Sequence, residues 1–190
     1  YKQLKSVSAP TTARYRFFSR TVADPDRILN QKNKEGFTAL HYSIFNRSTA
    51  CVELLLAAGA SATVQDNNGD TALSMAAYKG KDRILDILLK QEHPPLENLN
   101  KCGETPLTRS IKNHDLYCAK RLVESGASVT DGRRGKEPIF TIVRNNSYDM
   151  ITYLTQYNIP IDITTPYDET PLLIAASNNF IGCVRHLIRK

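Results

Sequence analysis

No apolar run in this 190-residue sequence is long enough to cross a membrane. The run from Leu54 to Ala58 is short, whereas a membrane-spanning helix needs about 20 predominantly apolar residues. No charged segment leads into an apolar core, so the sequence gives no indication of a secretory signal. The chain begins at Tyr1 rather than Met, and we therefore expect its natural start to lie upstream.

The sequence also lacks a set of residues that could carry catalysis or hold a metal. Its four histidines, His41, His93, His114 and His186, are scattered along the chain. None forms a closely spaced set with Cys, Asp or Glu, which a metal site would need. No Ser-His-Asp or Cys-His arrangement can be assembled either. We therefore predict that the chain is not an enzyme and needs no cofactor.

One glycine-rich segment has the composition of a phosphate-binding loop without its pattern. A Walker loop has Gly five residues before its Gly-Lys pair and Ser or Thr after the lysine. Around Gly135-Lys136, those two positions hold Thr130 and Glu137. We interpret the segment as a positively charged loop tip.

The positive charge of the chain is concentrated at its beginning. Residues 1–34 hold eight of the 25 basic residues and two of the 19 acidic ones. The net charge of this segment therefore equals the formal net charge of the whole chain, +6. The rest of the chain therefore holds basic and acidic residues in equal numbers. Any electrostatic attraction to a polyanion should originate in residues 1–34.

A short phrase recurs five times along the chain at an almost constant interval. Its clear copies begin at Gly36, Gly69 and Gly103, and weaker copies begin at Gly135 and Asp168. The first copy reads Gly-Phe-Thr-Ala-Leu and continues to His41. A fixed period of about 33 residues predicts one supersecondary unit stacked on copies of itself.

These motifs closely resemble the ankyrin repeat. Its signature is Thr-Pro-Leu-His followed by a Leu-Leu-x-x-Gly-Ala element, which matches the segment from Thr38 to His41 and then Ala58-Gly59-Ala60. The resemblance covers roughly residues 30–190. It implies an all-α solenoid of helix-turn-helix units joined by short β-hairpin-like loops, in which His41 bridges backbone turns.

The repeat frame predicts the domain organisation. Residues 1–12 form a partly flexible basic segment, and residues 13–35 form a degenerate capping helix with its loop. Tyr15, Phe18 and Val22 fall on one face of that helix. The array occupies residues 36–190, with units starting near 36, 69, 103, 135 and 168, and we expect the last unit to be truncated.

The same frame predicts two helices in each unit. The first helix starts at a Thr or Glu and ends nine residues later, at Arg47, Gly80, His114, Asn146 and Asn179. The second helix carries an apolar pair, in which Thr155 is the one polar exception. Cys51, Cys118 and Cys183 each lie four residues after the first helix ends, where we expect small apolar core residues. Reduced thiols favour the cytoplasm or nucleus.

The resemblance implies that loop tips and first helices line a concave groove that binds another protein or peptide. By position, the groove is first aromatic and then basic, which suits a partner that has apolar and acidic residues. The predicted partner-binding residues are Phe37, Tyr42, Phe45, Asp70, Met75, Tyr78, Lys79, Glu104, Arg109, Lys112, Lys136 and Arg144.

Two other functions stay open at this point. Residues 1–34 mix basic and aromatic side chains and could anchor the chain to nucleic acid or an anionic membrane. Alternatively, the array could regulate an enzyme or channel domain elsewhere in the same polypeptide.

Overall fold

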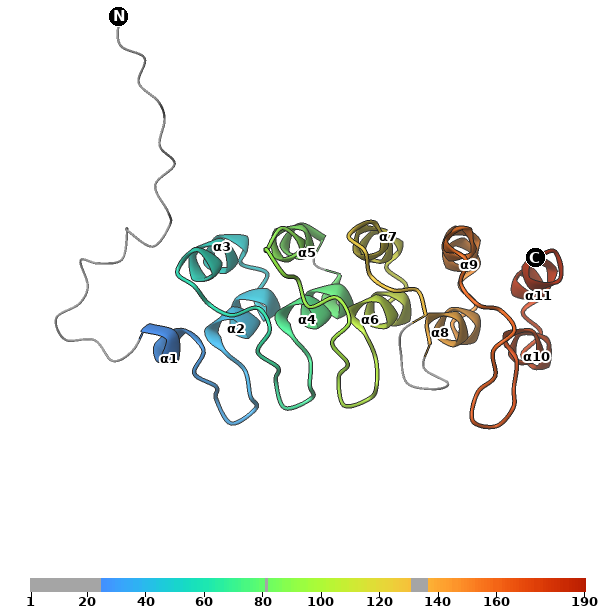
Figure 1. The fold of residues 1–190 in the computed structure, drawn as a ribbon, viewed down its shortest axis with the longest axis horizontal. Helices are drawn as coiled ribbons and strands as arrows, with labels where there is room; N and C mark the ends of the chain where they lie inside the picture. The colour runs from blue at the N-terminus through green and yellow to red at the C-terminus, as the bar shows by residue number, and fades with distance from the viewer. Residues whose placement is uncertain (1–24, 81, 131–136) are drawn as a thin grey trace, which may run out of the picture.

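The structure, a computed structural model, describes residues 25–80, 82–130 and 137–190. Its helices lie in two rows that run the length of the molecule (Figure 1). The first row holds α2 (Ala39–Phe45), α4 (Ala72–Lys79), α6 (Pro106–Lys112), α8 (Pro138–Arg144) and α10 (Pro171–Ser177). The second row holds α3 (Thr49–Ala57), α5 (Asp82–Leu89), α7 (Leu116–Glu124), α9 (Tyr148–Leu154) and α11 (Ile181–Ile188).

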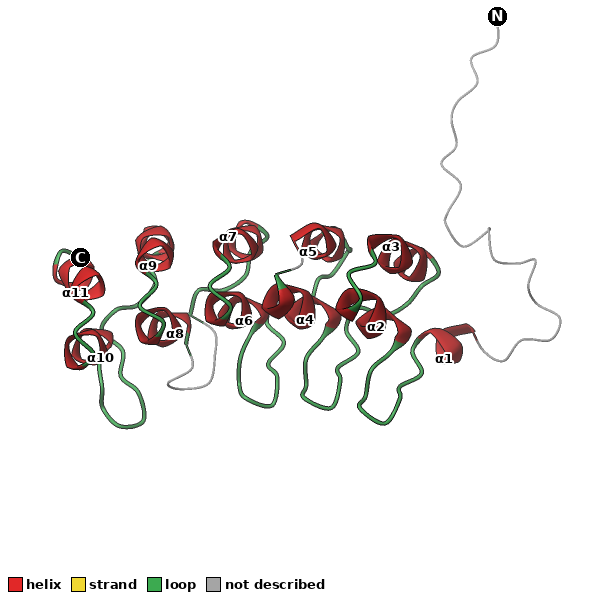
Figure 2. Ribbon diagram, turned by 180° about the vertical axis from the view of Figure 1, so that it is seen from behind, coloured by secondary structure: helices red, strands yellow, loops and turns green. Residues whose placement is uncertain are grey.

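Short loops extend from one side of the first row, and the described residues contain no strand (Figure 2). A short helix, α1 (Pro25–Leu29), precedes the first unit. The all-helical solenoid predicted from the repeats is therefore confirmed. None of the helices within residues 25–80, 82–130 and 137–190 is both long and apolar enough to span a bilayer.

The first helices begin where the repeated threonines provide caps. The Thr71, Thr105 and Thr170 hydroxyls accept hydrogen bonds from the backbone N–H three residues ahead, at 3.1–3.2 Å. Such a cap satisfies one of the backbone donors that a helix leaves unpaired at its N-terminus. In the first unit the bond is reciprocal, because the Thr38 backbone N–H donates to His41 Nδ1 at 3.2 Å.

The five residues predicted to end the first helices all adopt the left-handed conformation. Their φ angles lie between 49° and 59°. The helices themselves end one or two residues earlier, and the left-handed residue turns the chain toward the second helix. Glycine and asparagine tolerate this geometry, but two of the five positions hold less suitable residues, Arg47 and His114.

A single apolar core runs between the two rows of helices. The leucine or isoleucine of the repeated phrase is fully buried at Leu40, Leu73, Leu107 and Ile139. Its counterpart in the fifth unit, Leu172, is exposed because the described residues place no unit after it. Burial at each position therefore depends on the neighbouring units, as expected for a solenoid.

The loops are braced both internally and against each other. Asn33, Asp66 and Asn100 each use a side-chain oxygen to accept two backbone N–H groups of their own loop. Neighbouring loops are joined by backbone bonds, such as Asn67 N–H to Glu35 O at 3.0 Å. A Cβ atom on Gly36 would lie only 2.5 Å from the backbone nitrogen of Asn67, so this close approach requires glycine.

Thr155 marks a local change in the fourth unit. Helix α9 ends at Leu154, and a 3₁₀ turn, η2 (Thr155–Tyr157), follows it. The buried Thr155 hydroxyl donates to Ile151 O at 2.8 Å and lies 2.9 Å from His186 Nε2. The hydroxyl is thus satisfied within the core, which explains how the stack accommodates a polar residue here.

The cysteine prediction is correct for two residues and wrong for the third. Cys118 and Cys183 are buried, whereas Cys51 is exposed. Cys51 belongs to the first unit, and no described residues cover it from the preceding side. The predicted segment 1–12, residues 13–24 of the predicted capping segment 13–35, and the first two residues of the weak phrase, Gly135-Lys136, lie outside the described residues.

Candidate functional site

The most distinctive surface of the described chain is a line of aromatic and cationic side chains on the first three units. Phe37 comes from the first loop, while Tyr42 and Phe45 project from α2. The Phe37 and Tyr42 rings meet edge to face, with centroids 5.6 Å apart. Tyr42 is 45% exposed and Phe45 is 54% exposed, so both remain accessible to a partner.

Cations from the next two units continue this line. Lys79 Nζ lies 5.2 Å from the centroid of the Phe45 ring and 5.8 Å from that of Tyr78. The Arg109 guanidinium lies over the Tyr78 ring, 3.9 Å from its centroid. We call Phe37, Tyr42, Phe45, Tyr78, Lys79 and Arg109 the aromatic strip. Its rings and cations stabilise one another through cation–π contacts.

Met75 does not join the exposed surface as predicted. It is only 6% exposed and belongs to the apolar core of the stack. The same repeat position holds the exposed Tyr42 in the first unit. Met75 is therefore a core residue and is not available to a partner.

The predicted basic stretch contains an ion-pair network that neutralises part of its charge. Arg109 Nη2 lies 2.8 Å from Asp70 Oδ2, and Arg109 Nη1 lies 3.4 Å from Glu104 Oε2. Lys112 Nζ contacts the other Glu104 oxygen at 2.9 Å. Asn100 Nδ2 donates to both acids, to Asp70 at 3.1 Å and to Glu104 at 3.2 Å. Two acidic and two basic groups thus balance at this point.

This network changes the interpretation of four predicted binding residues. Asp70 and Glu104 are buried, and their carboxylates face Arg109 and Asn100. The surface between the second and third units is therefore less basic than the sequence suggested. Asp70 and Glu104 act as supports that hold Arg109 against Tyr78.

The two carboxyls of the network respond differently to their surroundings. Burial raises the pKa of Asp70, and the nearby Arg109 charge and the Asn100 bond offset this only in part. Burial also acts to raise the pKa of Glu104, but hydrogen bonds from Lys112 and Asn100 outweigh it, so the net pKa is lowered. Asp70 is therefore the carboxyl most dependent on Arg109 for its ionised state.

His41 occupies a structural position between two loops. Its Nδ1 bonds to Thr38, and its Nε2 lies 3.3 Å from Asp70 O of the following loop. Burial lowers the pKa of His41 and favours the neutral ring. The bridging role implied by the resemblance is therefore observed, and His41 is only 1% exposed to any ligand.

The remaining predicted residues lie toward the later units. The Arg144 guanidinium is 5.7 Å from the centroid of the Phe140 ring, on α8. Lys136 lies outside the described residues. The structure thus brings the residues of the aromatic strip together, and Arg144 contacts the Phe140 ring of its own helix.

Sequence reasoning missed the loop residues that support the site, Asn100 above all. A signal for them exists in the repeat frame. Asn33, Asp66, Asn100 and Thr165 each lie three residues before the left-handed residue that begins the repeated phrase. Short polar side chains at that spacing are typical of Asx and ST turns.

One cluster resembles a metal site but has a structural explanation. One ligand atom each from Asp82, Asp115 and Cys118 lie within 4.8 Å of one another, and no other such group is found among the residues placed by the structure. Asp115 is the N-cap of α7 and accepts from Cys118 N at 2.9 Å. Burial raises the pKa of the Cys118 thiol strongly, which disfavours the thiolate that a metal would bind.

Comparison with known proteins agrees with this geometry. The family model described as ankyrin repeats (3 copies) matches residues 46–133. The solved ankyrin repeat domain of Bcl-3 superimposes with a TM-score of 0.78 at 28% identity, covering 85% of this chain and 73% of that one. The stacked helix pairs, loops and caps thus define an ankyrin-type solenoid, and residues 46–133 belong to the ankyrin repeat family.

Two curated relatives illustrate how this segment occurs in other proteins. The NF-kappa-B p105 subunit of Gallus gallus is 29% identical over 82% of this chain. The human B-cell lymphoma 3 protein is 29% identical over 86% of this chain. The chain spans only 16% and 37% of the lengths of these two relatives.

Proposed function

We propose that the chain is a non-enzymatic protein-recognition module that binds a peptide or partner domain along its aromatic strip. The observation that carries this proposal is the exposure of Tyr42 and Phe45, together with Lys79 lying over the Phe45 and Tyr78 rings. Tyr, Phe and Arg are enriched at protein interfaces, and Tyr and Arg are frequent among their hot spots. The relatives support an interaction role, since p105 is described as a subunit of a larger factor.

The mechanism we propose is rigid presentation. The strip residues stand on helices and on loops that are fixed by Asn33, Asp66 and Asn100. Little ordering entropy would oppose binding, so more of the contact energy would appear as affinity. The partner would meet a surface already in its binding shape.

The contacts also refine the chemistry that we propose for the partner. Arg109 and Lys112 already pair with Asp70 and Glu104. Lys79 lies on aromatic rings and is exposed, so it provides a cation at the centre of the strip. The partner would therefore present apolar or aromatic side chains first, with an acidic group placed to meet Lys79.

The decisive experiment replaces the two exposed rings of α2. The Tyr42→Ala/Phe45→Ala variant should lose its partner in quantitative affinity capture, because each hot-spot truncation weakens binding by about 2 kcal/mol or more. A matched control is Ile181→Ala/Ile188→Ala, which removes two exposed apolar side chains from α11. Equal capture by the two double variants would contradict the proposal.

Salt dependence separates this function from the electrostatic alternative. Binding of nucleic acid or anionic lipid through residues 1–34 should weaken steeply with salt, because it depends on counterion release. Binding along the aromatic strip should change little. Salt-sensitive binding that also survives the Tyr42→Ala/Phe45→Ala substitutions would favour the anchor.

As parts of the same proposal, we place the chain in the cytoplasm or nucleus and within a larger scaffold, adaptor or regulatory protein. The exposed free thiol of Cys102 suits a reducing compartment. If the array instead regulates an enzyme or channel domain of the same polypeptide, that domain would bind to the aromatic strip. The same Tyr42→Ala/Phe45→Ala variant would then alter activity of the full-length protein.

A further inference from the structure

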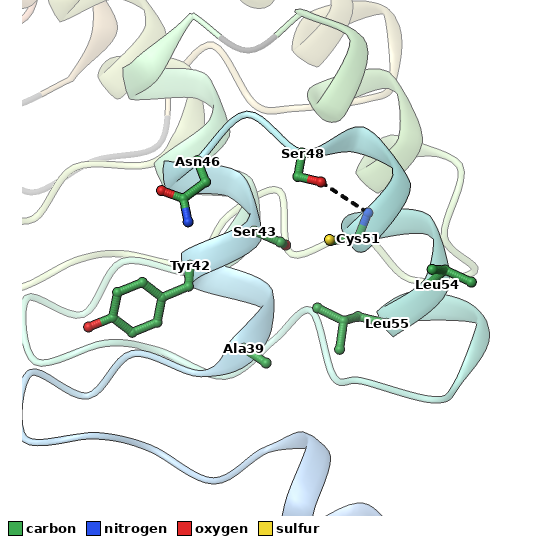
Figure 3. Close-up of a pocket in the computed structure, with 8 residues that line it drawn as sticks. All are labelled: Ala39, Tyr42, Ser43, Asn46, Ser48, Cys51, Leu54 and Leu55. Carbon is green, nitrogen blue, oxygen red and sulfur yellow. Dashed lines mark hydrogen bonds between the residues drawn. The ribbon is translucent and has the colours of Figure 1, made fainter.

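The first unit of the stack has an apolar hollow between α2 and α3. Its volume is about 460 Å³, and Figure 3 shows Ser43, Cys51 and Leu55 around the space between the two helices. Leu54 at its edge is 71% exposed. The complete lining consists of Ala39, Tyr42, Ser43, Asn46, Ser48, Cys51, Leu54 and Leu55.

The hollow consists of positions that are buried in the later units. Cys51 is exposed, but its counterparts Ile84, Cys118, Met150 and Cys183 are each no more than 3% exposed. Leu55 is partly exposed, while Leu88, Leu122 and Leu154 are no more than 1% exposed. In the second, third and fifth units the preceding second helix packs against the second helix of the unit, in the pairs α3–α5, α5–α7 and α9–α11. The first unit therefore presents a surface shaped for one more second helix.

The repeat frame extends backward beyond the first unit. The Ser61 backbone N–H donates to Asn30 Oδ1 at 2.9 Å, and two units later the Ser128 N–H donates to Glu97 Oε1 at 2.7 Å. The separation in sequence from Ser61 to Ser128 is the same as that from Asn30 to Glu97, so the two hydrogen bonds are equivalent in the repeat frame. The segment around Asn30 thus holds the place of the loop that follows a second helix. Just before it, α1 lies at the same end of the stack as the hollow (Figure 1).

Subtracting one period from α3 (Thr49–Ala57) gives residues 16–24, which lie outside the described residues. In this frame Phe18 corresponds to Cys51, and Val22 corresponds to Leu55. Both core positions would be apolar. Phe17 corresponds to Ala50, which is exposed on α3. The segment thus carries the pattern that the hollow requires, and it joins the described chain next to α1.

We propose that residues 16–24 form the second helix of a partial leading unit and cover this hollow. Phe18 and Val22 would then pack against Cys51 and Leu55, as the later second helices pack on one another. Tyr42 lines the hollow as well as the aromatic strip. The covering helix would therefore also fix the first end of the strip. This inference stands on the repeat frame and does not depend on the proposed function.

Cys51 provides a built-in probe of the covering segment. A maleimide pulse on the full chain, followed by peptide mass spectrometry, measures its labelling rate against that of Cys102, which is exposed in the third loop. We expect Cys51 to be labelled about tenfold or more slowly than Cys102, because the reagent must reach the thiol. Cys51 labelled as fast as Cys102 would overturn the proposal.

Two adjacent phenylalanines supply the matched variants. Phe18→Ser should bring the Cys51 rate close to the Cys102 rate, whereas Phe17→Ser should leave Cys51 protected. The two proteins have the same composition, so a difference between them reports which face of residues 16–24 is buried. Equal rates in both variants would overturn the proposal. Protection that increases with protein concentration and is unaffected by Phe18→Ser would instead indicate a second copy of the chain.

Discussion

Replacing Arg109 with Met tests whether the ion-pair network holds the strip together. The substitution keeps an unbranched side chain against Tyr78 but removes the guanidinium that lies 3.9 Å from that ring. It also leaves the Asp70 and Glu104 carboxylates without their shared cation. Glu104 retains Lys112, whereas Asp70 retains only the amide of Asn100.

The expected loss of stability is about 3 kcal/mol, because breaking a buried ion pair by removing one partner costs about 3–5 kcal/mol. We choose the low end because the Arg109 side chain is 14% exposed and Lys112 still pairs with Glu104. For a chain of this size, about 2–4 °C of melting temperature corresponds to each kcal/mol. The melting temperature should therefore fall by about 6–12 °C.

Urea unfolding monitored by circular dichroism measures the loss in the free energy of unfolding, and a double variant tests its cause. The Asp70→Asn/Arg109→Met double variant should recover a large part of the stability, because no buried carboxylate is then left unpaired. The deficit of Arg109→Met alone should shrink as the pH falls toward 4, because protonated Asp70 no longer needs a cation. Burial already raises the pKa of Asp70, so this effect should begin above the ordinary titration range of an aspartate.

Two results would refute this reasoning. The first is an Arg109→Met protein within about 0.5 kcal/mol of the parent, a change typical of an ordinary surface substitution. The second is a double variant whose loss equals the sum of the two single losses, which would mean that Asp70 and Arg109 do not interact.

Three further predictions concern backbone geometry and pH. Gly36→Ala should lose about 2 kcal/mol more than Gly59→Ala in urea melts, because both have positive φ but only Gly36 closely approaches another loop. Arg47→Gly should raise stability by up to about 1 kcal/mol, since it relieves a left-handed φ of 58°; a loss would contradict this. Burial lowers the pKa of His41 from 6.5, so the unfolded chain binds the proton first as the pH falls. The stability advantage over His41→Gln should therefore decrease from about pH 7 to pH 5, and a growing advantage would contradict this sign.

Much of the fold could be predicted from the chain because each unit repeats the same local instructions. The helix caps at Thr71, Thr105 and Thr170 are hydrogen bonds between residues only three positions apart in the sequence. The left-handed turn at Gly80 likewise depends on local backbone chemistry. Local signals of this kind are present in the sequence and need no knowledge of distant contacts.

The candidate site was harder to predict, because repeat position alone does not determine burial. Tyr42 and Met75 share one position, yet Tyr42 is exposed and Met75 is buried. Cys51 and Cys118 share another, with the same contrast. No described unit precedes the first unit, whereas each later unit packs against the unit before it. Equivalent repeat positions therefore have different surroundings.

The sequence by itself determined the repeating unit, its helix caps and turns, and which residues could face the side of the loops. Only the tertiary structure decided which of those residues are available to a partner. Arg109, Asp70 and Glu104 come from different units and meet only when the units stack. Their pairing neutralises charges that the linear sequence presented as a basic surface, whereas Tyr42 and Phe45 on the first unit stay exposed. The physical reason is that charge pairing and burial depend on distances between units, which a repeat period does not contain.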